Sequence, residues 1–168
     1  MFTGPSVWHK GEIKAQSALD FLRASSGGYN AIESQLPLEH RQLLEELLFL
    51  PVASLDSQGR PWASLLTSDG SRGFVSAPYN YRIRIKGTLT TGDPIQANLN
   101  SGHRVLNKHL VAGVALSLEN RRRNKFGGYL ESVDFHDGQY EMDLRINTAL
   151  GNCPSRLPFL FWVAKTHA

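Results

Sequence analysis

The chain has 168 residues, 41% of them hydrophobic, and its 18 Lys and Arg against 15 Asp and Glu give a formal net charge of +3. This length suffices for one domain with a substantial core and is short for two. The single cysteine excludes an intramolecular disulfide and argues against a zinc site, and the small charge gives little support for nucleic-acid binding. No apolar run reaches membrane-spanning length, so we expect a cytoplasmic protein with no membrane contact.

Two helices are predicted near the N-terminus. Residues 13–24 place apolar side chains on one helical face, and a flexible Ser-Ser-Gly-Gly break follows at 25–28. A second helix begins at Pro37, because proline fits the first helical turn, where its missing N–H is not needed. Its apolar stripe comprises Leu38, Leu43, Leu44, Leu47 and Leu48. We expect one domain over 1–168, with an N-terminal arm and helix at 1–35 and a diverged tail at 155–168.

A β-hairpin is the best defined local element. Two strands, 50–55 and 62–67, flank a turn in which Asp56 can cap its own backbone and Gly59 is free to adopt positive φ. The second strand mixes apolar side chains with the hydroxyls of Ser64 and Thr67. We therefore predict that one face of this hairpin is core and the other is polar.

The remaining chain reads as short strands with one further helix. Strands are predicted at 73–77, ended by Pro78, at 83–85, at 111–118, which is apolar enough for burial on both faces, and at 129–135 and 140–147. Asp93 and Pro94 open a helix, and Gly127-Gly128 marks a bulge. Many short strands joined by Gly- and Pro-rich turns indicate a mainly β barrel or sandwich with peripheral helices.

The residues that could bind a ligand are two basic groups, one turn and a tryptophan. The cluster at 121–125 could bind a phosphate or be a solvated turn, and Arg82 and Arg84 could add phosphate donors near strand hydroxyls. The turn at 151–154 could present an amide and a thiol to a ligand, or bury Cys153. Trp62 could stack on a planar ring, or lie in the core or a subunit interface. The six histidines form no metal-ligand pattern, so we expect no metal.

An ordered set of motifs resembles a known family. In the first half of the chain the segments are W-H-K-G-E at 8–12 followed by Gln16, DSQGRPWASLLT at 56–67, and GFV at 73–75. Further along the chain they are Arg84-Ile85, GDP at 92–94, RRR at 121–123 with Gly128, and GNCP at 151–154. Together they resemble the pyridoxamine 5′-phosphate oxidase-like FMN-binding split barrels, in particular a poorly characterised subgroup that begins with a W/F-H-x-G-E segment.

The resemblance implies a six-stranded antiparallel split β-barrel that forms a homodimer, with FMN in a cleft at the subunit interface. The family's cofactor-binding positions correspond here to Trp62, Ser64, Thr67, Ser76, Arg84, Arg123, Lys125 and Asn152. The oxidase itself has Arg and Lys where this chain has Trp62 and Thr67, which argues against pyridoxamine phosphate as the substrate.

The function that follows is an FMN-dependent oxidoreductase acting on a small organic substrate. Its FMN phosphate would be held by Arg84 and Arg123, and no catalytic side chain is identified, since the cofactor supplies the chemistry. The alternatives are a split barrel that has lost flavin and acts as a binding protein, or a cofactor-independent enzyme on a small molecule.

Overall fold

The computed structural model describes residues 10–19, 32–88, 90–119 and 121–152. The chain divides into two units, 1–32 and 33–168. In the first, helix α1 runs over Lys10–Ala18, which overlaps the helix predicted at 13–24; residues 20–24 and the 25–28 break lie outside the described ranges. Cys153 and the tail at 155–168 also lie outside them.

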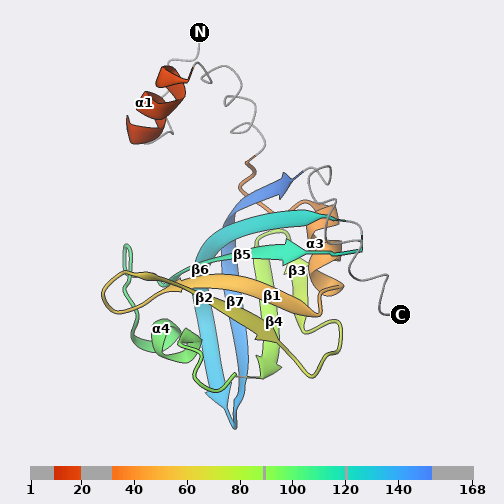
Figure 1. The fold of residues 1–168 in the computed structure, drawn as a ribbon. Coiled ribbons are helices and arrows are strands. Elements are labelled where there is room, and N and C mark those ends of the chain that lie inside the picture. The colour runs from red at the N-terminus through yellow and green to blue at the C-terminus, as the bar shows by residue number, and fades with distance from the viewer. Residues whose placement is uncertain (1–9, 20–31, 89, 120, 153–168) are drawn as a thin grey trace, which may run out of the picture. The chain divides into compact units, whose positions relative to one another are not determined.

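The second unit is built on seven strands in one antiparallel sheet (Figure 1). Their order in space is β2-β1-β5-β6-β7-β4-β3, and an additional pairing of β2 with β4 closes the first six into a barrel. The strands are β1 Phe49–Leu55, β2 Pro61–Thr67, β3 Val75–Tyr79, β4 Arg82–Thr88, β5 Leu110–Leu116, β6 Arg123–His136 and β7 Gln139–Asn152. The predicted mainly β barrel with peripheral helices is confirmed, with β3 as an extra edge strand.

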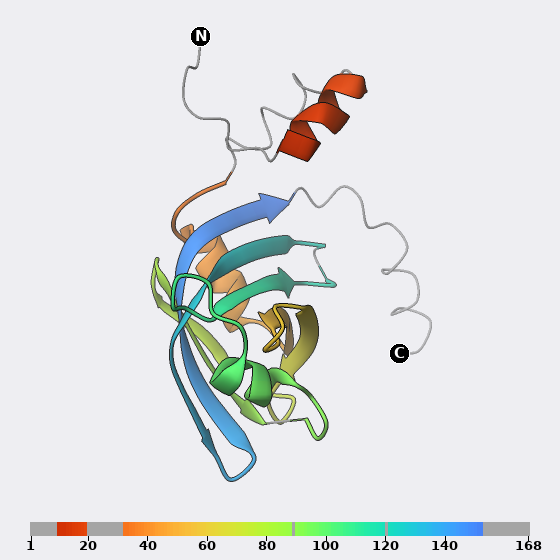
Figure 2. The same cartoon turned by 90° about the vertical axis from the view of Figure 1, so that its left-hand side faces the viewer.

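Two strands are much longer than the others. β6 and β7 have 14 residues each and form one hairpin, whereas β5 pairs with β6 only between Arg123 and Tyr129. The distal half of the hairpin therefore extends beyond β5 (Figure 2). The bulge predicted at Gly127-Gly128 is present as a register shift, and a Cβ on Gly128 would collide with the Arg145 carbonyl oxygen.

Within the described ranges, two helices lie against the barrel. α3 (Leu38–Glu45) lies against β3 and β5, and α4 (Ile95–Ser101) against β1 and β6. The predicted cap of α4 is confirmed, because Asp93 Oδ1 accepts the Ile95 N–H at 2.8 Å.

Side chains that point inward form a single core. Leu50 and Val52 of β1, Ile83 and Ile85 of β4, and Met142 and Leu144 of β7 are all at most 3% exposed. The alternation predicted for 140–147 is confirmed, with Tyr140, Met142, Leu144 and Ile146 buried.

The structure differs from the sequence prediction in six places. β6 begins at Arg123, so residues 123–125 of the basic cluster lie in a strand. β7 continues to Asn152, so the first two residues of the turn predicted at 151–154 also lie in a strand. Leu38 and Leu48 are exposed, the latter because α3 ends before it. β3 continues through Pro78, which an edge strand tolerates next to a register shift. β4 spans seven residues. β5 is buried on one face only, since nothing in the described ranges covers Leu110 and Ala112.

Closure of the barrel depends on Gly87. The closing pair is Thr67 with Thr88, and a Cβ on Gly87 would collide with the Thr67 carbonyl oxygen and the Tyr140 hydroxyl. We expect Gly87→Ala to lower the free energy of unfolding by about 1–3 kcal/mol in urea denaturation. Gly127→Ala is the matched control, because its Cβ would meet only Thr148 Cβ at 3.7 Å. Equal stability of the two variants would contradict the closing role of Gly87.

Burial of His40 predicts acid sensitivity. This α3 side chain is 6% exposed, and burial lowers its pKa from 6.5, against the opposing effect of Glu39 and Glu33. Below pH 6.5 the unfolded chain takes up the proton more readily than the folded chain. We therefore expect the thermal midpoint to fall as the pH falls below this value.

The His40→Gln variant should show a shallower dependence of the thermal midpoint on pH, while the exposed His136→Gln should behave like the native chain. A residual slope is expected from His109, whose pKa is also lowered by burial and by Arg104. An unchanged slope in His40→Gln would contradict this explanation.

Candidate functional site

The predicted polar wall of β2 divides between the two faces of the strand. Ser64 is buried and its Oγ donates to Asp93 Oδ1 at 2.6 Å, so this hydroxyl supports the cap of α4 from inside the barrel. Thr67 lies on the opposite, outer face because side chains alternate along a strand. The two hydroxyls therefore do not face one ligand.

Trp62 is fixed by the hairpin turn. Its indole Nε1–H donates to Asp56 Oδ2 at 3.0 Å, and Arg60 Nε donates to the same oxygen at 2.7 Å. The N–H groups of Gln58 and Arg60 bind the other carboxylate oxygen at 2.9 Å each. The Trp62 hydrogen bond, with the Arg60 and Gln58 donors, holds the pKa of Asp56 well below its usual range. With 45% of its surface exposed, Trp62 is not a core residue.

Ser76 and Arg84 lie on the outer face of β3 and β4, where they are directly paired. Arg84 donates Nε to Asp143 Oδ1 and Nη2 to Asp143 Oδ2, both at 3.0 Å. The hydrogen bond and charge of Asp143 raise the pKa of Arg84. Asp143 therefore occupies two nitrogens of the Arg84 guanidinium. This makes Arg84 a weaker candidate for binding a phosphate.

Arg123 and Lys125 have a different environment. Both lie on the outer face of β6, two residues apart, and neither forms an ion pair within the described residues. Arg123 Nε is buried and has no hydrogen-bond partner among the described residues. Arg122 instead donates to the Glu39 carbonyl oxygen at 2.9 Å. Residues 123–125 of the basic cluster therefore begin a strand, and the phosphate role predicted for them stays a prediction.

The strand register separates the two basic groups. Arg84 is opposite Asp143 on β7, and Arg123 is opposite Asn152, nine residues further along the same strand. Nine residues of extended strand span roughly 30 Å. The prediction that Arg84 and Arg123 hold one phosphate together is thus inconsistent with the register within one subunit.

Small side chains form a row across the barrel that the sequence did not reveal. The register aligns, strand by strand, Ala63, Ala53, Ala112, Gly127 and Thr148. An apolar groove of about 260 Å³ lies over the middle of this row, at Ala53, Ala112 and Gly127, with Leu55, Pro61 and Leu110 at its sides. Only the pairing of five strands reveals the row, because its members are scattered along the chain.

The groove and the basic pair share one face. Gly127 lies two residues from Lys125 on the outer side of β6, roughly 7 Å along the strand. Lys125 is opposite Leu150, and Arg123 is opposite Asn152, whose side chain lies outside the described set. Of the sequence-predicted positions, the structure therefore brings together Arg123, Lys125 and the backbone of Asn152.

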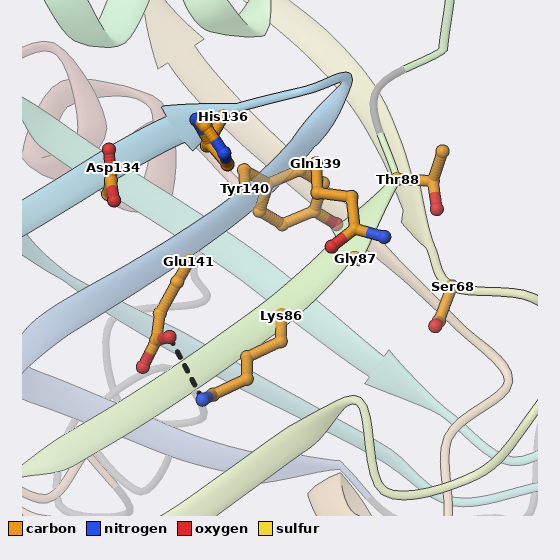
Figure 3. A pocket seen from close by; sticks show the side chains of 9 residues that line it. All are labelled: Ser68, Lys86, Gly87, Thr88, Asp134, His136, Gln139, Tyr140 and Glu141. Atoms are coloured by element: carbon orange, nitrogen blue, oxygen red, sulfur yellow. Dashed lines mark ion pairs between the residues drawn. The ribbon is translucent and has the colours of Figure 1, made fainter.

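A second hollow of about 350 Å³ lies at the end of the β6–β7 hairpin (Figure 3). Lys86 Nζ contacts Glu141 Oε2 at 2.9 Å, and Asp134 is a further carboxylate in the wall. Figure 3 shows the Lys86 and Glu141 side chains pointing toward one another. With its single lysine neutralised and a carboxylate in excess, this hollow is unsuited to a phosphate.

Among the described residues no group of three or more His, Cys, Asp or Glu side chains is arranged to hold a metal ion. None of the helices in the described ranges is long and apolar enough to cross a membrane.

Comparison with known proteins gives similarity in structure alone. No protein-family model and no curated protein matches the sequence. Solved structures do match: a protein assigned as a pyridoxamine 5′-phosphate oxidase from Lactobacillus delbrueckii is 15% identical, with a TM-score of 0.51 over 70% of this chain and 94% of that one.

Two further structures are similar at lower scores. An F420 reductase is 14% identical, with a TM-score of 0.47 over 68% of this chain and 98% of its own. HupZ of Group A Streptococcus is 10% identical, with a TM-score of 0.49 over 69% of this chain and 93% of its own. The Lactobacillus match, together with the closed six-stranded barrel and its added strand, shows that this chain has the split-barrel fold of the pyridoxamine 5′-phosphate oxidase-like proteins.

Proposed function

We propose that this protein is an FMN-dependent oxidoreductase that acts on a small organic substrate, with the cofactor in a cleft on the outer face of β2, β1, β5 and β6. The observation that carries the proposal is the apolar groove of small side chains beside two cations that have no carboxylate partner in the part of the chain that the structure describes. The fold match to a protein assigned as a pyridoxamine 5′-phosphate oxidase supports it.

The phosphate of FMN requires positively charged donors, and the basic pair supplies them. Arg123 offers a planar guanidinium, and Lys125 adds a second charge on the same face. Because Arg123 Nε is buried, a phosphate would bind through the terminal nitrogens of this guanidinium. Ser64, Ser76 and Arg84 lie away from this face and are not needed there.

The isoalloxazine ring requires a flat apolar surface, and the groove supplies one. Ala53, Ala112 and Gly127 project so little from the sheet that a planar ring can approach the backbone. When bound, FMN would supply hydride or electron transfer. The chain's own residues would bind and orient the cofactor and exclude water from one side of its ring.

A second copy of the chain would complete the cleft. Leu65 is 52% exposed and Leu110 is 40% exposed, and both border the row of small side chains. Covering this face with the same face of a partner would remove the apolar surface from water and enclose the ring. We therefore propose that the protein forms a homodimer and that the cleft lies at its interface.

FMN titration tests the assignment of the phosphate site. Arg123→Ser should weaken FMN affinity by about 10- to 100-fold in a flavin-fluorescence titration, because one charge-assisted hydrogen bond is worth about 1.5–3 kcal/mol. Arg84→Ser is the matched control and should change affinity by less than about twofold, since Asp143 already occupies that guanidinium.

The reverse pattern, with a loss in Arg84→Ser alone, would relocate the phosphate to β4. A native chain that is colourless when purified and does not quench FMN fluorescence would refute the flavin proposal as a whole. Circular dichroism of both variants would confirm that each has folded.

Leu65→Asp tests the dimer. A charge at the centre of the proposed interface should give a monomeric mass in light scattering at micromolar concentration, because burying an unpaired carboxylate is costly. It should also weaken FMN binding. Leu106→Asp is the control, as Leu106 is 89% exposed and lies outside this face. A native chain that is itself monomeric would contradict the shared cleft.

A further inference from the structure

A basic hollow lies where β6 runs beyond the end of β5. It has a volume of about 770 Å³ and is walled by β6 residues 129–133, by α4 and by the loop that follows α4. The Leu130 N–H donates to the His109 carbonyl oxygen at 2.9 Å. From Glu131 onward β6 has no β5 partner, so the hollow occupies the open part of the split barrel.

Three cations and one carboxylate line this hollow. Arg82 Nη2 lies 2.8 Å from Glu131 Oε2, and the hydrogen bond to Glu131 raises the pKa of Arg82. Neither Arg104 nor Lys108 forms an ion pair within the described residues. The lining therefore has an excess of two positive charges.

The two unpaired cations are held by uncharged partners. Arg104 Nε donates to His109 Nε2 at 2.8 Å, which requires the neutral imidazole with its proton on Nδ1. Lys108 Nζ lies 3.6 Å from the centre of the Tyr129 ring. Both contacts orient a side chain without supplying an anion, so each head group retains donors for a ligand.

Like charges are also brought together beside the hollow. Arg82 on β4 is directly opposite Arg145 on β7, an arrangement that destabilises a sheet. Arg145 lies over the Tyr81 ring at 4.0 Å. A bound anion would offset the repulsion between the two guanidinium groups.

The loop that carries Lys108 is held in an uncommon conformation. Val105 and Lys108 exchange backbone hydrogen bonds at 2.9 and 3.0 Å. The two residues between them, Leu106 and Asn107, have φ of 51° and 63°, in the left-handed region that a leucine rarely adopts. Backbone strain of this kind is typical of binding loops.

We propose that this hollow binds a small organic phosphate. A phosphoryl group carries a charge near −2 and three acceptor oxygens, which match Arg104 and Lys108, the two cations of the lining without an ion pair among the described residues. Leu99 and Leu130 supply an apolar floor for the organic part. The site is separate from Arg123 and Lys125 and does not depend on FMN being the cofactor.

Phenyl phosphate is a suitable probe, because it carries the phosphoryl group on a small apolar body. We expect saturable binding by isothermal titration calorimetry in 0.15 M chloride, near physiological ionic strength. The double variant Arg104→Ser/Lys108→Ser should weaken it at least about tenfold, since it removes two charge-assisted contacts. The control Arg72→Ser/Lys86→Ser removes the same charge from exposed pairs elsewhere and should bind like the native chain.

A third variant distinguishes loss of the binding site from misfolding. Glu131→Gln removes the only carboxylate of the hollow at nearly constant size, so it should tighten phenyl phosphate binding, a gain that misfolding cannot produce. Absence of binding to the native chain, or equal losses in the two double variants, would overturn the proposal. Loss in Arg123→Ser/Lys125→Ser with retention in Arg104→Ser/Lys108→Ser would also overturn it, by placing the probe at the flavin site.

Discussion

Closure of the barrel between β2 and β4 is the constraint on which the other features depend. It rests on the pair Thr67–Thr88, reinforced by the Tyr140 hydroxyl, which donates to the Thr67 carbonyl oxygen at 3.3 Å. Burial of Tyr140 raises its pKa, so the hydroxyl remains a donor. Only a glycine at position 87 leaves space for these groups. Once the sheet is closed, every strand has an inner and an outer side, and the side chains divide between them with a period of two.

This division decides which polar groups can act together. Ser64 and Asp93 turn inward and hold α4 against the barrel, whereas the charged residues turn outward. On β4 and β7 some of the outward charges neutralise one another, as in Arg84 with Asp143 and Lys86 with Glu141. On the outer face of β6, no carboxylate among the described residues forms an ion pair with Arg123 or Lys125. Unbalanced positive charge therefore marks ligand sites better than the number of basic residues does.

Much of the fold could be predicted from the sequence, because hairpin turns, helix caps and alternation are local signals. The Asp56 turn, the cap at Asp93 and the inward face of 140–147 were all readable in this way. Less of the candidate site could be predicted from the sequence. The row Ala63, Ala53, Ala112 and Gly127 exists only through strand pairing, and the excess charge at Arg104 and Lys108 depends on which carboxylates lie near. Such facts follow from register, which one sequence does not determine.

The outer face of β6 links the two proposed sites. Arg123, Lys125, Gly127 and Tyr129 follow one another on it at a spacing of two residues, so the groove at Gly127 has a cation pair on one side. Lys108 lies over Tyr129 on the other side. Both cation clusters contribute positive potential at the groove, and the contribution of each falls off with distance from it. The groove therefore attracts anionic molecules from either end and repels cationic ones.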